Sequence, residues 1–183
     1  MIKKVIVLAL AAFIGTSLMA QTVQETTTMV GEKTVTAYTV SLQKDVKMVQ
    51  EAMNQRLKDA KLKTKKSEGF IAALDQVFTD ISQNSLSLYT KVEEQGKRKD
   101  KVTVVTVCAI SNDLTISQSA INGNVRNFVQ NFVQYINKYE AGQQMEAEQA
   151  NLKKAEAERK AEEANQNVKA VEGEVEKYRQ MSE

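Results

Sequence analysis

The sequence of 183 residues contains no histidine, no proline and no tryptophan, and it has a single cysteine, Cys108. The absence of histidine excludes Ser-His-Asp catalysis, imidazole-bound zinc and His-ligated haem. One cysteine excludes an internal disulfide and clusters that need several thiolate ligands. Because proline is the residue that most often interrupts a helix, its absence favours a chain with much uninterrupted helix. We expect no cofactor and no metal.

The first twenty residues have the pattern of a secretory signal peptide. Lys3 and Lys4 form a positive start, residues 5–14 are apolar without a charge, and a stretch of small residues ends at Ala20. We therefore predict cleavage after Ala20 and a periplasmic or secreted protein. No later segment approaches the 18 or more apolar residues of a spanning helix, so the mature chain is not expected to be transmembrane.

The charges divide the chain into two parts. Removing Lys3 and Lys4 from the 25 basic residues leaves 23, which balances the 23 acidic ones. Residues 21–138 carry 16 basic and 12 acidic groups, whereas residues 139–183 carry 7 and 11. A neutral exported chain is not expected to bind nucleic acid. We predict a leader over 21–32, a domain over 33–139 and a charged helix over 140–183. The threonine tract at 26–28 is either part of a mobile leader or an extension of the strand that follows it.

The domain is predicted to be an α+β two-layer sandwich in the order strand, helix, strand, strand, strand, helix. Alternating or β-branched runs predict strands over 33–42, 85–92 and 101–110, and a short apolar run predicts another from 69 to 74. Residues 75–81 fit a continued strand or a helical turn equally well. Apolar stripes of helical spacing predict one helix over about 43–62 and a second that ends near Tyr139. Both helices should cover one face of the sheet.

The C-terminal segment has the composition of a long helix with a weak coiled-coil seam. Five of the apolar seam positions are alanine, which buries little area, so a lone or docked helix, self-association and disorder all remain open. In a parallel pair, Lys153 would face Glu158 and Glu174 would face Arg179. The apolar seam positions, spaced by three and four residues, are Ala147, Ala150, Ala157, Ala161, Ala164, Val168, Val171, Val175 and Tyr178.

Two clusters of basic residues are candidates for binding an anion. One interpretation is that they are ordinary solvated faces, since cations at a helix C-terminus also complement its dipole. The alternative is an anionic partner, either a glycan, a lipid headgroup or the acidic C-terminal segment. The nine residues are Lys58, Lys61, Lys63, Lys65, Lys66, Lys97, Arg98, Lys99 and Lys101.

Catalytic chemistry has little support in the sequence. Cys108 stands in a strand and is predicted to be a small buried hydrophobe, with an intermolecular disulfide as the alternative. Asp75 and Asp80 cannot be placed at a shared site, so a glycan hydrolase that uses two carboxylates ranks third among the functions considered. No phosphate-binding loop or nucleophile elbow is present.

Residues 81–93, ISQNSLSLYTKVE, precede a Val/Thr-rich strand and a helix that runs into a charged C-terminal segment. In this arrangement the chain resembles a group of uncharacterised small exported proteins of Gram-negative anaerobic bacteria. The resemblance implies compartment and architecture but no activity. We predict a non-enzymatic binding or structural module of the bacterial envelope, whose partner is another envelope protein or a second copy bound through the C-terminal helix. Recognition of an anionic glycan or lipid is the alternative.

Overall fold

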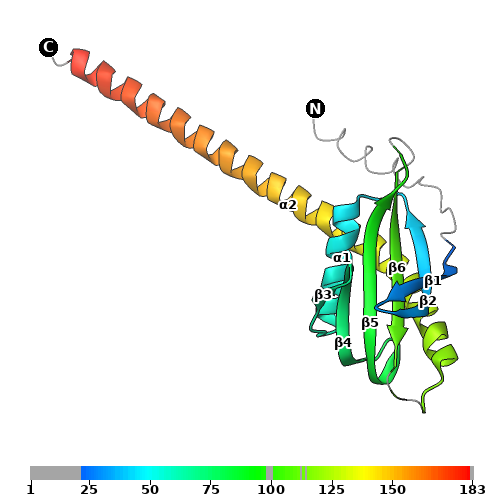
Figure 1. Ribbon diagram of the computed structural model, residues 1–183. Helices are drawn as coiled ribbons and strands as arrows, with labels where there is room; N and C mark the ends of the chain where they lie inside the picture. The colour runs from blue at the N-terminus through cyan, green and yellow to red at the C-terminus, as the bar shows by residue number, and fades with distance from the viewer. Residues whose placement is uncertain (1–21, 98–100, 112, 114, 182–183) are drawn as a thin grey trace. The chain divides into compact units, whose positions relative to one another are not determined.

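The computed structural model describes residues 22–97, 101–111, 113 and 115–181. The chain divides into two compact units, and the boundary between them in the sequence lies between Ile136 and Asn137. Figure 1 shows the elements in chain order, which are β1 (Gln24–Val30), β2 (Lys33–Leu42), α1 (Val46–Asp59), β3 (Lys65–Ser67), β4 (Phe70–Phe78), β5 (Ser82–Gln95), β6 (Val102–Ile110) and α2 (Gln118–Met181).

The six strands form one antiparallel sheet in the order β1-β2-β6-β5-β4-β3, which confirms the α+β class. β6 lies between β2 and β5, and seven of its nine residues are buried. This central place agrees with its apolar residues on both faces. The edges of the sheet are β1 and β3.

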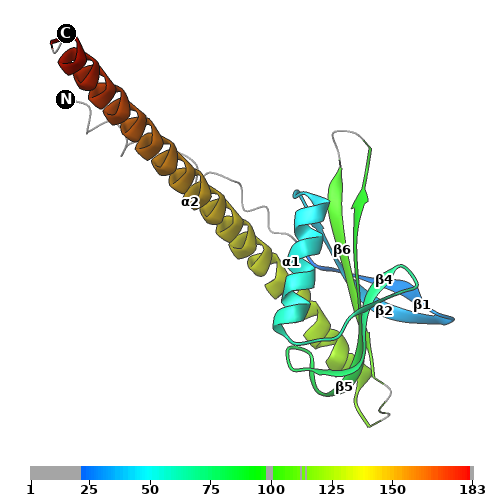
Figure 2. The same cartoon turned by 90° about the vertical axis from the view of Figure 1, so that its left-hand side faces the viewer.

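Within the first unit, α1 and the first part of α2 lie on the same face of the sheet (Figure 2). Thr103 anchors the start of α1, since its hydroxyl donates to the Lys44 carbonyl at 2.7 Å. Asn124 ties α2 to the sheet side by donating to the Ile81 carbonyl at 2.8 Å. The two helices contribute these buried side chains to the core: Val49, Ala52, Met53, Leu57, Ile121, Val125, Phe128, Val129, Phe132 and Ile136.

The order of the elements differs from the prediction at the N-terminal side. Residues 21–32 were predicted to be a leader, but Gln24–Val30 form β1 and pair with β2. The two-residue turn between them begins at Gly31, whose φ of 60° suits the turns that join tightly paired strands. The Thr-rich run is therefore one half of a hairpin. Residues 1–20, where the signal peptide is predicted, lie outside the described residues.

The middle of the chain also contains one strand more than predicted. Lys65–Ser67 form the short edge strand β3, and two lysines in three residues give no apolar alternation from which to predict it. The undecided segment 75–81 continues β4 as far as Phe78, after an irregularity between Ala73 and Gln76. β5 is longer than predicted and runs from Ser82 to Gln95.

The two C-terminal helices of the prediction are one element. α2 runs without interruption from Gln118 to Met181, through the predicted junction of domain and tail at residues 139–140. Gly142 lies within the helix, where glycine costs about 1 kcal/mol relative to alanine but does not end it. All described residues from 141 onward are exposed.

The ends of α1 are capped by side-chain and backbone hydrogen bonds. The Asp45 carboxylate accepts from the backbone N–H of Lys47 at 2.9 Å and of Met48 at 3.1 Å. At the other end Leu62 N–H donates to the Leu57 carbonyl at 3.0 Å, with Lys61 at φ 59°. This left-handed position after a helix is usually glycine, because a side chain is strained there.

We therefore expect Lys61→Gly to raise the free energy of unfolding by about 0.5–1 kcal/mol, as relief of the strain outweighs the extra freedom of glycine in the unfolded chain. Urea unfolding measures the change. Lys58→Gly is the matched control, since this residue lies inside the last turn of α1 and its replacement should destabilise by about 1 kcal/mol. Equal losses in both variants would contradict the proposed cap.

Candidate functional site

The first predicted basic cluster forms an exposed edge of the first unit. It follows the last turn of α1, the loop after it and β3. Its five members are all exposed: Lys58, Lys61, Lys63, Lys65 and Lys66. Two of them, Lys63 and Lys65, line an open depression of about 490 Å³ together with Thr64, Leu74 and Gln76.

The second basic cluster lies at a different end of the sheet. Lys65 of β3 pairs with Ala72 of β4, and Ala72 pairs in turn with Tyr89 of β5. Gln95, the last residue of β5 before the second cluster, is six residues beyond Tyr89, or about 20 Å at the usual rise. Lys101 is engaged there by Glu94, at 2.6 Å. Arg98 and Lys99 lie outside the described residues.

The basic residues that the structure describes thus do not meet at one concave site. This separation removes the geometric support for a single anion site built from both clusters. In the first cluster the loop is held in place by Gln76, whose amide donates to the Lys63 carbonyl at 2.7 Å and accepts from the Lys63 N–H at 2.8 Å. The lysine side chains themselves remain in solvent, as surface charges commonly do.

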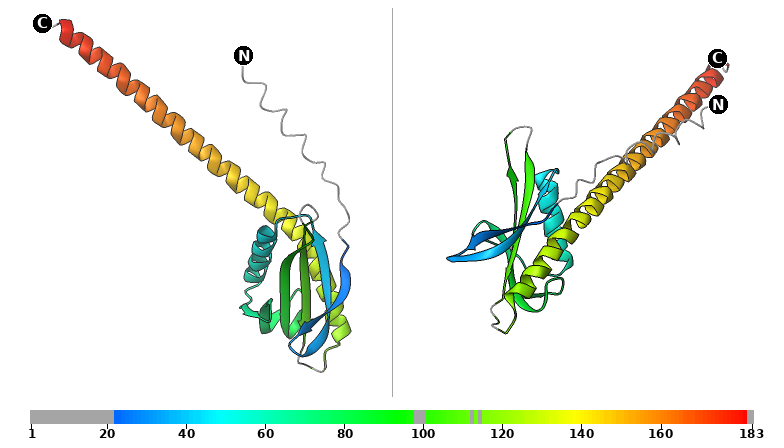
Figure 3. Two further views of the ribbon diagram at one scale, coloured as in Figure 1. Left: turned by 45° about the horizontal axis from the view of Figure 1, so that its top comes forward. Right: turned by 90° about the vertical axis from the view of Figure 1, so that its right-hand side faces the viewer.

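The sheet curls toward the side that the helices do not cover. The Gly31 N–H, in the turn after β1, donates to the Glu68 carboxylate in the turn after β3, although β1 and β3 are opposite edges. Figure 3 shows the β1–β2 hairpin bending away from the helices. The roll buries a small apolar cluster of Val30, Ala37 and Cys108.

Cys108 is fully buried in this cluster, which confirms that it is a core residue. Tyr89, Val35 and Ile110 pack around it. Burial raises the pKa of the Cys108 thiol to about 12, so the thiol is protonated at neutral pH. A thiol in this state is neither a nucleophile nor accessible for a disulfide with a partner in the folded protein.

Next to the cluster, the same face opens into a polar groove of about 340 Å³, which no motif in the sequence predicts. Two rows of opposed residues cross it. Lys91, Thr106, Thr39 and Gln24 form one row, and Glu93, Val104 and Ser41 form the next. The residues that line the groove are Gln24, Thr26, Thr27, Thr28, Thr39, Ser41, Lys91, Glu93, Gln95, Val104 and Thr106.

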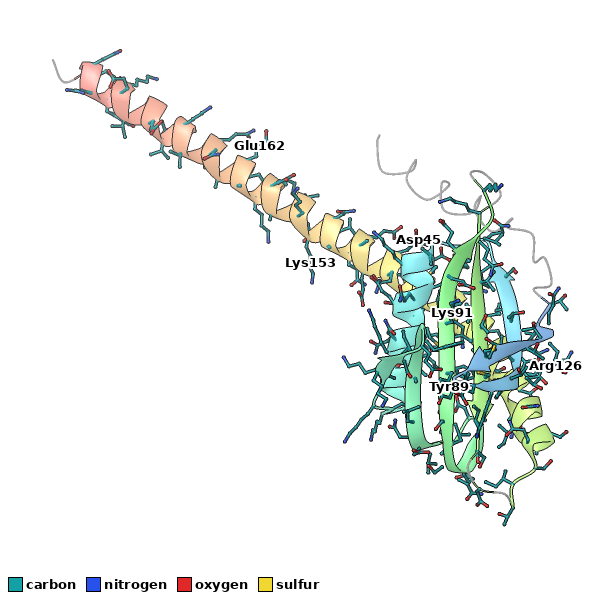
Figure 4. All side chains as sticks on the ribbon, in the orientation of Figure 1. Asp45, Tyr89, Lys91, Arg126, Lys153 and Glu162 are labelled. Carbon is teal, nitrogen blue, oxygen red and sulfur yellow. The ribbon has the colours of Figure 1, made fainter. Side chains whose placement is uncertain are left out.

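The charges in the groove cancel. Lys91 Nζ lies 2.7 Å from a Glu93 carboxylate oxygen, and the other oxygen accepts from Gln95 Nε2 at 3.1 Å. The hydrogen bond from Lys91 lowers the pKa of Glu93, even though partial burial acts in the opposite direction. The carboxylate is therefore ionised at neutral pH and balances the ammonium. Figure 4 labels Lys91 and Tyr89 on β5, where residues of the same parity share a face.

In the second unit, the predicted seam is accessible along its bulky half. Val168, Val171, Val175 and Tyr178 are 55–69% exposed. In the seven-residue repeat that defines the seam, Met145 and Leu152 occupy the position farthest from the seam, on the outer side of the helix. Two ion pairs along the helix, Lys154–Glu158 at 4.0 Å and Arg159–Glu163 at 3.7 Å, are also exposed. Such pairs add a few tenths of a kcal/mol each to helix stability.

No family model, curated protein or solved structure matches the chain. The resemblance drawn from residues 81–93 therefore stays a prediction, and the function must be argued from the geometry. Within the described residues, no helix is long and apolar enough to cross a membrane. The same residues contain no group of three or more Cys, Asp or Glu side chains placed to hold a metal ion.

Proposed function

We propose that the protein is an exported, non-enzymatic binding or structural module of the bacterial envelope that self-associates through the C-terminal part of α2. The observation that carries the self-association is the seam formed by Val168, Val171, Val175 and Tyr178, which is exposed over its whole length. An isolated polar helix gains nothing from apolar residues at this spacing, whereas a second helix would bury them.

The charges beside the seam favour a parallel pair of copies. Flanking positions would bring Lys153 against Glu158 and Glu174 against Arg179 of the second copy, with no like charges opposed in the flanking pairs. Lys154 occupies a seam position, and one polar residue there commonly fixes the register at some cost in stability. The five alanines make the N-terminal half of the seam thin, so the valine-rich half should supply most of the affinity.

Two other parts of the proposal, that the protein is exported and that it is not an enzyme, are each supported by a separate feature. Residues 1–20 carry the charge, apolar run and small-residue end of a signal peptide. The sequence has no histidine, and the only thiol is buried and protonated. A module that binds or connects other molecules needs neither group.

Sedimentation of the chain from residue 21 to 183 over a wide range of concentrations tests the proposal. We expect a reversible monomer–dimer equilibrium. Val171→Gln with Val175→Gln should weaken it roughly 100-fold, because four valine side chains per dimer would lose their burial. Glutamine is a good helix former, so the helix itself should persist.

The matched control is Met145→Gln with Leu152→Gln. It removes two equally exposed apolar side chains from the other side of the helix and should leave the equilibrium unchanged. A chain that stays monomeric at every concentration would overturn the self-association, as would equal weakening by both double variants.

A further inference from the structure

We propose that the polar groove on the rolled face of the sheet binds a neutral oligosaccharide. The inference rests on the binding part of the proposed function and does not depend on self-association, since the groove belongs to β1, β2, β5 and β6 of the first unit.

The lining of the groove is rich in hydroxyl groups. Thr26, Thr28, Thr39 and Ser41 project from two neighbouring strands by the alternation of the sheet, and Thr106 lies in the floor. A hydroxyl group both donates and accepts hydrogen bonds, as every sugar hydroxyl does. The groove thus matches a ligand whose polar groups are of mixed donor and acceptor character.

The floor and walls give the groove the shape of a binding surface and not of a flat sheet face. Val104 and Thr106 are only 7% and 8% exposed. They lie on the face of the sheet that α1 and the first part of α2 do not cover, so the helices do not account for this burial. They are shielded by the walls that β1 and β5 form on either side. The Val104 side chain and the threonine methyl groups supply apolar contact for the C–H faces of a sugar ring.

The electrostatics favour an uncharged ligand. Among the described residues, the only charged groups that line the groove are Lys91 and Glu93, which neutralise each other at 2.7 Å. An anionic ligand would have to displace Glu93 from Lys91, and a cationic one would have to displace Lys91. Either exchange loses a charge-assisted hydrogen bond that is already made.

An extended peptide fits this place less well. β2 and β6, which form the floor of the groove, are each paired with a strand on both sides, so their backbone groups are used within the sheet. β1 is paired only with β2, and residues 91–95 of β5 only with β6, so unpaired strand edges lie at the walls and not in the floor. A peptide that binds a sheet by its backbone needs a free strand edge, which the groove interior does not offer. Recognition must therefore come from side chains, and here most of these carry hydroxyl or amide groups.

Backbone amide NMR spectra of the chain from residue 21 to 183 test the proposal, with chitotetraose, cellotetraose, maltotetraose and xylotetraose as probes. We expect at least one of these to shift the amides of β1, β2, β5 and β6 around the groove. Thr28→Val with Thr39→Val keeps shape and strand preference while removing two hydroxyls, and it should weaken that binding at least about fivefold, as loss of two hydrogen bonds implies.

Thr34→Val with Thr36→Val is the matched control, because it changes two threonines of β2 on the opposite face, and it should bind like the unchanged chain. The inference is overturned if all four tetrasaccharides leave the groove amides unshifted, if the shifts lie elsewhere, or if both double variants bind equally. Sedimentation of the same samples separates this outcome from a failure of self-association, which would leave the groove shifts in place.

Discussion

Replacing Phe128 with alanine is expected to lower the free energy of unfolding of the first unit by about 3–5 kcal/mol. Phe128 is 2% exposed and lies at the junction of α2 with the sheet. Its ring meets Phe78 of β4 edge to face, with centroids 5.2 Å apart, and stacks on Phe132 one turn along α2 at 6.3 Å. Truncation would leave a cavity bordered by two other rings, which cannot close it without moving the helix.

Urea unfolding followed by tyrosine fluorescence and far-ultraviolet circular dichroism measures this loss. Tyr178→Ala serves as the control, because this ring is 69% exposed on the second unit and its removal should change the unfolding of the first unit by less than about 0.5 kcal/mol. A loss below about 1 kcal/mol for Phe128→Ala would contradict the packing of α2 on β4.

The helical periodicity of the sequence identifies most of this core correctly. Val125, Phe128 and Phe132 recur at spacings of three and four, and all are buried. The same holds for Met53 and Leu57 in α1. Such patterns are informative because one continuous element buries one face, so the evidence lies within a single window of sequence.

β1 could not be predicted in the same way, because its place depends on pairing with β2 and not on its own pattern. Thr26, Thr27 and Thr28 are equally compatible with a solvated leader. Only the turn at Gly31, whose φ is 60°, and the register with β2 make the run a strand. β3 escaped prediction for a related reason, since it is held mainly by its pairing with β4.

The groove could not be predicted either, because its residues are brought together only by the pairing of separate strands. Each of its threonines is an ordinary strand residue, and none carries a motif. The row that joins Lys91, Thr106, Thr39 and Gln24 exists only because three separate strand registers align. The basic residues show the same dependence on topology, since whether the two clusters meet could not be read from sequence, and strand pairing places Lys65 and Lys101 at different ends of the sheet. Composition identifies charge, but topology decides whether charges meet.

A proline introduced into α2 tests whether the stability of the first unit depends on the C-terminal part of this helix. We expect Ala161→Pro to interrupt α2, at a local cost of about 3 kcal/mol, because proline removes one backbone hydrogen bond and clashes with the preceding turn. Far-ultraviolet circular dichroism should show a loss of helix, and self-association should weaken to what the valine-rich half supports alone, because the seam no longer continues through position 161. The unfolding of the first unit should not change, since the buried side chains of α2 end at Ile136.

Ala161→Ser is the matched control for the substituted site. Serine costs only about half a kcal/mol within a helix, so helix content and dimer affinity should fall slightly or not at all. If Ala161→Pro also lowers the urea midpoint of the first unit, the two units are energetically coupled and the C-terminal part of α2 contributes to the domain. If it leaves the dimer affinity unchanged, the alanine half of the seam contributes nothing to the association, because a broken helix cannot present Ala150 and Val171 along one line.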